Sequence, residues 1–531
     1  MRATLRHAAF CLALSATVAQ AQAPAPQLDA ALLGLAQQET AALLETLRDL
    51  TSQDSGTTQA PGLLAVADRI ERFAKSLGGE TERVTPAAGV PGANLVITFK
   101  GKGTRKIMLM AHMDTVYPAG AAAARPFRVE GNRAIAPGIA DDKSGIAVFL
   151  HAMKLLKARG FQDYERVTMV FNVDEERGSG GSRDLIRNQA QAHDYVMSGE
   201  PTFPTEALVL GTSGVGQFAA RLRVADAFAP ADARPIEELA DLILRSKDVQ
   251  AQVPNTRMNW TIARAEEPRT LDKLAADHRF ATLSFRVKGR ASHAGVNPAG
   301  GINAVVEMAS VVQRVTEAAA KLPSAKLQWR IVSGGLVGNV IPDRGSAVAE
   351  LALPKTADSE AALQFLALRG TQAFVPGAEI TVDISDGLVA NTNGTGEAFA
   401  SADQRVPDPA TFSALSQAAR QLVGRHKFPA SSITVTDGLG FPAFVATEEG
   451  KRMAALAQGI YAAMGGKLAV VPHIWGATDA VWAAQSGKPV IESMGLPGGN
   501  FHSSQEEFVL IDRIPRRLAL VAEMIRALSR P

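Results

Sequence analysis

Acidic and imidazole side chains recur in this 531-residue sequence directly after apolar runs and before Gly- or Ser-rich turns. The segments that carry them are IMLMAHMDT, GIADDKSG, FNVDEERGSGG, SGEPT and GGNFHSSQEEF. Such a pattern is typical of strands that end at the ligand-binding edge of a parallel sheet. Carboxylates mixed with two imidazoles suit a pair of borderline divalent cations, and such pairs activate water. The pattern therefore predicts a two-metal hydrolase.

His112 and Asp114 are two residues apart at an expected strand end, so their side chains leave on the same face. His112 could then bind a metal through one ring nitrogen while Asp114 accepts the N–H of the other. The competing interpretation of His112 is a buried, hydrogen-bonded core histidine, because His-x-Asp alone is weak evidence.

Two pairs of adjacent acids follow. Of Asp141 and Asp142, one carboxylate could bridge two cations while the other caps the helix that opens near Ser144, and the spacing does not say which. Glu175 and Glu176 point in different directions, so Glu176 can bind a metal while Glu175 takes a proton from water. A solvated surface pair neutralised by the next residue, an arginine, is the alternative for these two glutamates.

Glu200 ends an expected strand before a proline, and His502 lies in a Gly-rich loop. With them the candidate metal ligands are two histidines and three carboxylates, namely His112, His502, one of Asp141 and Asp142, Glu176 and Glu200. They offer each metal two terminal ligands and a shared bridge, which leaves room for water and substrate.

The chain carries a formal net charge of +2 and no basic tract, which argues against nucleic-acid binding. At its start, Arg2 and Arg6 precede the apolar run 8–18 and a series of small residues that ends at Ala23. This pattern indicates a cleavable export signal at 1–23, too short for a stable membrane anchor, with a buried amphipathic helix as the alternative. We therefore expect an exported protein, periplasmic or secreted. The only cysteine, Cys11, would be removed with the signal.

Apolar runs predict strands that helical segments separate, and this alternation favours a mostly parallel sheet covered by helices on both faces. The expected helices are 28–50, 64–77, 145–159, 452–464 and one from 512, and the expected strands are 94–99, 106–111, 167–173, 195–198 and 207–210.

The pattern changes between about 214 and 437 to strand–helix–strand units of alternating polarity. AARLRVADAFAP with TRMNWTIARA is similar to TLSFRVKGRASHAG with AKLQWRIVSGG, and AEITVDISDGL is similar to SSITVTDGL. We interpret this as a duplicated α/β subdomain inserted into the sheet domain, with chance similarity of amphipathic units as the alternative. The expected organisation is a signal at 1–23, catalytic parts at 24–213 and 438–531, and the insertion at 214–437.

APGIADDKSGIAVFLHAMKLLK, FNVDEERGSGGSRDLI, SGEPT and SGKPVIESMGLPGGNFHSSQEEF resemble the M20 family of zinc metallopeptidases, in its glutamate carboxypeptidase (carboxypeptidase G2-like) branch. The resemblance implies a zinc-bearing α/β domain with an inserted α+β lid of βαβ units, here doubled. It implies two Zn²⁺ per chain, whose ligands Co²⁺ or Mn²⁺ can also use. It assigns Glu175 as the general base, Asp114 as the partner of His112 and a cis peptide after the bridge. The implied bridge is Asp141, and the implied terminal ligands are His112, Glu176, Glu200 and His502.

In the lid, GRASHAG resembles the segment whose histidine, here His293, stabilises the oxyanion, and Asn339 resembles a substrate-contacting asparagine. Only one lid copy keeps both residues. Our hypothesis is that the distal copy stands in for a dimer partner and makes the protein monomeric, as in some dipeptidases of the family. Leu439 stands where the glutamate-specific branch has an arginine, and we expect His473 and Trp475 to shape a different pocket.

The expected activity is hydrolysis of a C-terminal peptide or amide bond next to a free carboxylate, on small peptides. The first alternative is an N-acyl-amino-acid amidohydrolase, which the same site would also support. The second is an exported metal-dependent binding protein without catalysis. The presence of Glu175 argues against this alternative, because a binding protein needs no base.

Overall fold

The computed structural model describes residues 28–87, 89–225, 234–274, 277–295, 298–322, 324–335, 338–356, 358–389, 394–502 and 505–530. The expected export signal at 1–23 lies outside these residues. Among the helices that the structure describes, none is both long enough and apolar enough to cross a bilayer.

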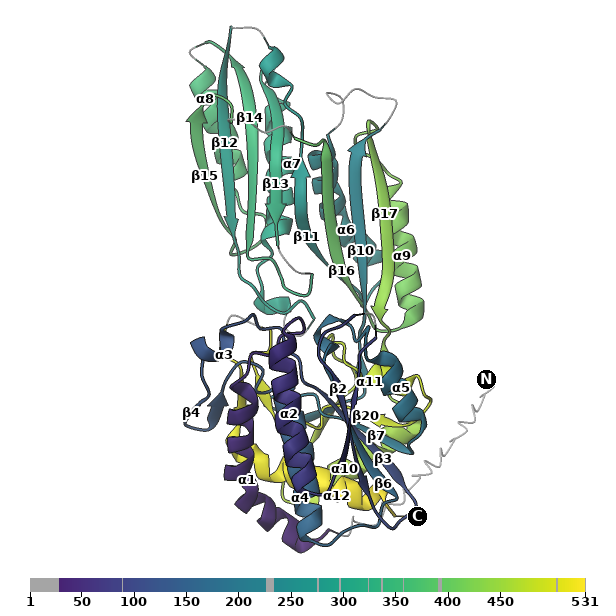
Figure 1. Ribbon diagram of the computed structural model, residues 1–531. Helices are drawn as coiled ribbons and strands as arrows, with labels where there is room; N and C mark the ends of the chain where they lie inside the picture. The colour runs from purple at the N-terminus through teal and green to yellow at the C-terminus, as the bar shows by residue number, and fades with distance from the viewer. Residues whose placement is uncertain are drawn as a thin grey trace, which may run out of the picture.

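The catalytic domain is built on a six-stranded sheet (Figure 1). Four neighbouring strands run parallel, and the two strands at one edge are antiparallel. Nearly every residue of the central strands is buried, as expected for strands covered on both faces. In order across the sheet the strands are β1 (Glu80–Val84), β2 (Asn94–Lys100), β6 (Arg166–Asn172), β3 (Lys106–His112), β7 (Tyr195–Ser198) and β20 (Val490–Ile491).

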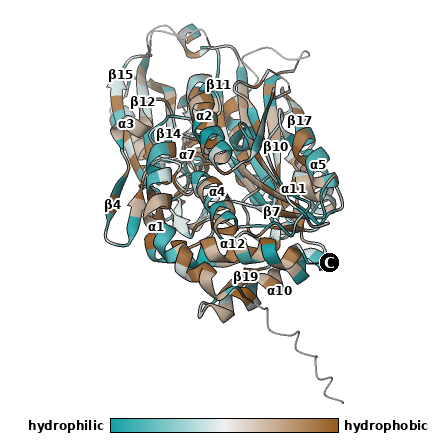
Figure 2. Cartoon of the chain, turned by 60° about the horizontal axis from the view of Figure 1, so that its bottom comes forward, coloured by the Kyte–Doolittle hydropathy of each residue, from teal (hydrophilic) through white to brown (hydrophobic). Residues whose placement is uncertain are grey.

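Helices cover both faces of this sheet, which confirms the expected fold class. One face packs on α1 (Ala30–Thr51), α2 (Ala60–Ser76), α4 (Lys143–Ala158), α10 (Glu448–Ala463) and α12 (Ile514–Leu528). Figure 2 shows α1, α4 and α12 side by side. The other face packs on α5 (Arg183–Gln191) and α11 (Ala480–Ala484).

Smaller elements frame the carboxyl edge of the sheet. A four-stranded sheet contains β21 (Gly498–Gly499), β22 (Phe508–Leu510), β5 (Arg133–Ile135) and β4 (Arg128–Glu130). Two short ladders join β8 (Ala207–Val209) to β19 (Ala469–Val471) and β9 (Gly211–Thr212) to β18 (Phe444–Val445), and α3 spans Ala121–Ala124.

The inserted lid forms one continuous eight-stranded antiparallel sheet with four helices packed on one face (Figure 1). Its strands are β10 (Gly214–Val224), β11 (Arg257–Glu266), β12 (His278–Lys288), β13 (Lys326–Gly334), β14 (Arg344–Pro354), β15 (Glu379–Asp386), β16 (Glu397–Val406) and β17 (Ser431–Phe441). Its helices are α6 (Pro235–Gln252), α7 (Ala304–Ala319), α8 (Ser359–Gly370) and α9 (Pro409–Val423).

The strand order, β15-β12-β14-β13-β11-β16-β10-β17, is that of two equivalent halves joined through β13 and β11. We call β10, β11, β16 and β17 with α6 and α9 the proximal half, and β12 to β15 with α7 and α8 the distal half. In the proximal half the rings of Phe218 and Trp260 lie 6.1 Å apart, and in the distal half those of Phe285 and Trp329 also lie 6.1 Å apart. Equivalent cores of this kind favour duplication over chance similarity.

A buried glutamate holds a loop in each half in the same way. Glu238 on α6 accepts backbone N–H groups of Lys427 and Phe428. Glu307 on α7 accepts those of Phe374 and Val375. The correspondence therefore extends from the strand order to individual buried hydrogen bonds. In each half a glutamate in the first turn of a helix satisfies two backbone N–H groups of a loop.

A buried histidine between α1 and α4 makes stability depend on pH. His151 contacts Glu39 through Nδ1 at 2.7 Å and Thr46 through Nε2 at 2.8 Å. Burial lowers the pKa of His151 to about 4, below the value of about 6.5 for a solvated histidine. The unfolded chain therefore binds more protons, and the stability contributed by neutral His151 is complete above pH 6.5 and lost as the pH falls toward 4.

We expect the free energy of unfolding of the wild type to fall more steeply between pH 6.5 and 4 than that of a His151→Gln variant. The difference should reach up to about 3 kcal/mol. Urea unfolding followed by circular dichroism across this pH range measures it. Parallel curves for the two proteins would contradict the assignment.

Candidate metal centre and active site

The candidate site lies beyond the carboxyl ends of three neighbouring parallel strands. His112 ends β3, Glu175 and Glu176 follow β6, and Glu200 follows β7. Because these strands run parallel, their ends meet at one edge of the sheet. Asp141 precedes α4, and His502 lies in the loop between β21 and β22.

Two groups of potential ligands meet at Asp141. In the first, His112 Nε2 lies 2.9 Å from Asp141 Oδ1 and 3.7 Å from Glu200 Oε1. In the second, His502 Nε2 lies 3.2 Å from Asp141 Oδ2 and 3.1 Å from Glu176 Oε1. Two ligands of a tetrahedral zinc ion are about 3.3 Å apart, so these spacings fit a pair of such ions.

Asp141 and Asp142 have different roles in this geometry. Asp141 offers one carboxylate oxygen to each ligand group, which is the arrangement of a bridging carboxylate. The Asp142 side chain accepts the backbone N–H of Gly145 at 3.1 Å and caps α4. The peptide bond between the two aspartates is cis, as the family resemblance implies.

The fully buried carboxylate of Asp114 holds several of these groups. Its Oδ1 lies 3.3 Å from His112 Nδ1 and accepts the backbone N–H of Glu175 at 3.1 Å. Its Oδ2 accepts the backbone N–H of Glu176 at 3.2 Å and the hydroxyl of Thr57 at 2.7 Å. The backbone oxygen of Asp114 also lies 3.1 Å from His112 Nδ1, so Asp114 orients the ring with both its carboxylate and its main chain, and Nε2 faces Asp141.

The site has a strongly negative field. Burial lowers the pKa of His112 and of His502, but the surrounding carboxylates outweigh it and hold both values well above the ordinary range. Burial and neighbouring carboxylates raise the pKa of Glu175 and Glu200. Burial alone would also raise the pKa of Asp141, but His112 and His502 outweigh it and hold the value well below the ordinary range. A site in which Glu175 and Glu200 are unfavourable as isolated anions favours bound cations.

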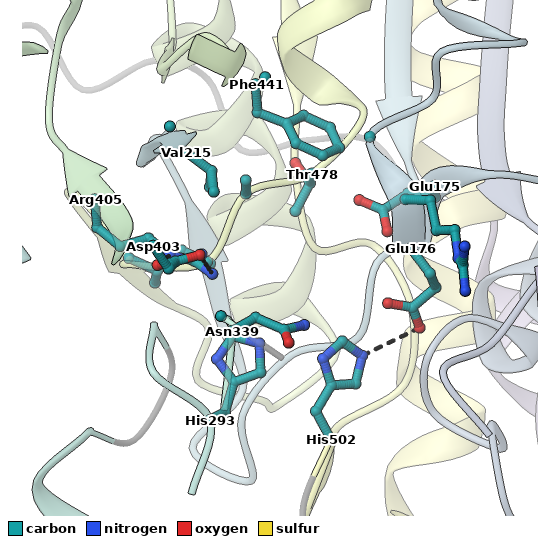
Figure 3. A pocket seen from close by; sticks show the side chains of 18 of the residues that line it. Glu175, Glu176, Val215, His293, Asn339, Asp403, Arg405, Phe441, Thr478 and His502 are labelled. Carbon is teal, nitrogen blue, oxygen red and sulfur yellow. Dashed lines mark hydrogen bonds and ion pairs between the residues drawn. The ribbon is translucent and has the colours of Figure 1, made fainter. Parts of the chain in front are cut away.

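The distal half of the lid contributes His293 and Asn339 to the same site. Their two segments pair: the Ala294 N–H donates to the backbone oxygen of Asn339 at 2.7 Å. The ring of His293 lies 4.9 Å from that of His502, beside Asn339 (Figure 3). His293 Nδ1 accepts the Gly295 N–H, so the proton of the neutral ring is on Nε2. Burial lowers the pKa of His293 well below its usual value, which keeps the ring neutral.

Sequence reasoning missed Arg405 on β16, which lines the cavity on the lid side. Its Nε and Nη2 donate to Asp403 at 2.7 and 3.1 Å, and its Nη1 donates to the backbone oxygen of Trp475 at 3.0 Å. Arg405 is only 4% exposed. The signal was an acid and a base two residues apart on one strand, which share a face of the sheet.

The expectation for His473 and Trp475 is wrong in detail. Their neighbours Ile474 and Gly476 line the cavity, whereas neither of the two is among its described lining residues. Trp475 instead lies under the guanidinium of Arg257, 4.1 Å from the ring centre to Cζ.

The cavity above the candidate metal ligands has a volume of about 830 Å³, enough for a dipeptide-sized ligand. Phe441 and Val215 lie on its opposite side from His293 (Figure 3). Leu439 lines it as well, so the proximal half supplies an apolar wall.

Comparison with known proteins agrees with this geometry. The model of peptidase family M20/M25/M40 matches residues 108–527. The chain is 33% identical over 530 residues to carboxypeptidase G2 of Pseudomonas sp. (strain RS-16), a match that covers 100% of this chain and 99% of that protein.

Solved structures share the fold at low identity. Human carnosine dipeptidase 1 superposes with a TM-score of 0.52 at 12% identity, covering 94% of this chain and 99% of that one. The M20 family metallo-carboxypeptidase Sso-CP2 from Sulfolobus solfataricus superposes with a TM-score of 0.51 at 16% identity, covering 93% and 99%. The chain therefore belongs to the M20 peptidase family and is a hydrolase of the metallo-exopeptidase type.

Proposed function

We propose that this protein is a di-zinc exopeptidase that hydrolyses the C-terminal peptide or amide bond next to a free carboxylate. The proposal rests on the position of Asp141. Its Oδ1 lies in the candidate ligand group that contains His112, and its Oδ2 lies in the group that contains His502. His112 and Glu200 would hold one ion, and Glu176 and His502 the other. When bound, the ions lower the pKa of a water molecule and polarise the scissile carbonyl.

Glu175 is the general base of the proposed reaction. Its backbone is held by Asp114, and its side chain lines the cavity beside Glu176 (Figure 3). It takes a proton as water attacks the carbonyl carbon, and it returns this proton to the leaving amine when the C–N bond breaks.

His293 stabilises the negative charge that develops on the carbonyl oxygen. Its ring is neutral, and the proton on Nε2 makes that atom a hydrogen-bond donor. Asn339 lies beside His293 in the cavity wall and is positioned to contact the substrate.

Arg405 supports a substrate with a free carboxylate. The buried guanidinium is fixed by Asp403 and by the Trp475 backbone oxygen, so its remaining N–H groups have a defined direction. A planar guanidinium recognises carboxylates through two parallel hydrogen bonds. The apolar wall that includes Leu439 then faces the rest of the substrate.

The decisive experiment is hydrolysis of a panel of dipeptides and N-acyl amino acids, each as the free acid and as the C-terminal amide, with metal content measured on the same sample. We expect about two zinc ions per chain and cleavage of the free acids only. Glu175→Gln should keep both ions and lose at least about 100-fold in kcat. Full activity of this variant would refute the assigned base. Cleavage confined to N-acyl amino acids would identify an amidohydrolase.

We further infer that one chain forms a complete active site as a monomer. His293 comes from the distal half, which β13 joins to β11 of the proximal half within the same sheet. In this proposal the distal half takes the role of a partner subunit, because it supplies His293 from within the same chain. In the described sheet β15 is an edge strand, and it carries Glu379, Asp383 and Asp386, each paired with a basic residue of β12. Charged side chains on an edge strand oppose further strand pairing.

Sedimentation should therefore give the mass of one chain. His293→Ala should lower kcat by about 100-fold or more, as for loss of an oxyanion donor. Co-expression of His293→Ala with Glu175→Gln should restore no activity, because each chain keeps one defect in its only site. Restored activity, or an obligate dimer, would contradict the proposal.

Export is the remaining part of the proposal, and it is supported by the basic and apolar pattern of residues 1–23. Cleavage after Ala21 or Ala23 would leave Gln22 or Pro24 as the first residue. Terminal sequencing of protein recovered from the periplasm or medium should find one of these. An intact Met1 in that fraction would contradict a cleaved signal.

A further inference from the structure

Glu507, at the residue before β22, has a buried carboxylate that the proposed reaction does not use. Its Oε1 accepts the backbone N–H groups of Ala140 at 2.8 Å and Asp141 at 3.0 Å. Its Oε2 accepts the backbone N–H of Gly138 at 3.0 Å. One side chain, only 2% exposed, therefore holds the whole turn that leads to the bridging aspartate.

The same carboxylate joins two further segments that carry ligands. The hydroxyl of Tyr117 donates to Glu507 Oε2 at 2.7 Å, and Tyr117 lies five residues after His112. Glu507 itself lies five residues after His502. The segments of His112, Asp141 and His502 thus meet at one carboxylate.

The turn that Glu507 holds has little freedom to adjust. Gly138 has a φ of +69°, which glycine adopts readily, and a Cβ there would lie 2.5 Å from Thr115 Cγ2. A buried carboxylate with four donors is satisfied at both oxygens. An amide in its place would put an N–H₂ group against the donors at one oxygen, so glutamine cannot reproduce the contact.

We propose that Glu507 is a positioning residue that sets the Asp141 carboxylate so that each of its oxygens reaches one metal ion. The inference rests on the proposed two-metal function and goes beyond it, because Glu507 touches neither metal nor substrate. Without this contact the backbone N–H groups of Gly138, Ala140 and Asp141 lose their common acceptor, and the Asp141 carboxylate is held less firmly. Binding of the second ion then weakens most, since it needs both oxygens of Asp141 in place.

The test is titration of the metal-free full-length protein with Zn²⁺, comparing the wild type with Glu507→Gln. We expect two ions in the wild type and, in the variant, about 10–100-fold weaker binding of the second ion. Glu307→Gln is the matched control, because Glu307 is also a buried carboxylate that holds two backbone N–H groups, but in the distal half of the lid. It should lower the thermal midpoint without changing zinc affinity.

Unchanged zinc affinity in Glu507→Gln, with a loss of thermal stability like that of Glu307→Gln, would overturn the proposal. If Glu507→Gln does not fold, Tyr117→Phe decides, because it removes one donor and leaves the three backbone contacts. The second ion should then bind about two- to tenfold more weakly, the effect of one hydrogen bond, and unchanged affinity would overturn the proposal.

Hydrolysis is not part of this measurement, so a failure of the proposed activity is distinguishable from a failure of the role proposed for Glu507. A wild type that binds two zinc ions but cleaves nothing in the panel would refute the proposed activity, and the titrations would still decide the role of Glu507. A wild type that binds fewer than two ions would overturn both.

Discussion

The buried carboxylate of Asp114 is the group on which the geometry of the site depends most. It contacts the His112 ring and two consecutive backbone N–H groups, those of Glu175 and Glu176. Burial of a carboxylate is unfavourable unless such donors surround it. The donors that Asp114 needs come from the ends of β3 and β6, so these ends are kept in one arrangement. These strands are neighbours in parallel register, with His112 opposite Asn172. A local requirement for hydrogen bonds thereby aligns two candidate ligands, His112 and Glu176, with the candidate base Glu175.

The lid contributes to the site through long-range contacts. The segment of His293 is held by the proximal half, because Arg257 donates to the backbone oxygen of Gly295 at 3.0 Å. Arg257 also stacks on Trp475 of the catalytic domain, to which Arg405 donates as well. Both lid halves and the catalytic domain therefore meet beside the cavity. These contacts place His293 of the lid beside the candidate ligands of the catalytic domain.

Much of the fold could be predicted from local patterns, and the rest depends on contacts between distant residues. The expected strand at 106–111 is β3, and the helix expected at 145–159 is α4, because apolar runs and helical periodicity are local. The division of roles between Asp141 and Asp142 could not be read from their spacing, since neighbouring residues differ only in what the folded chain brings to them. Glu507 was missed for the same reason: its partners lie more than 360 residues away. The antiparallel direction of β1 and β2 is likewise absent from any local pattern.

Charge balance supports the proposal that the site binds divalent ions. Asp141, Glu175, Glu176, Glu200 and Glu492 all line one cavity, and burial raises the pKa of Glu492 to about 7. Against these carboxylates the cavity offers few cations, and the guanidinium of Arg405 is already paired with Asp403. Monovalent ions at the two candidate ligand groups would leave most of the repulsion in place, whereas two dications would add four positive charges within contact distance. Carboxylates that weaken the folded state when alone thus become the source of metal affinity.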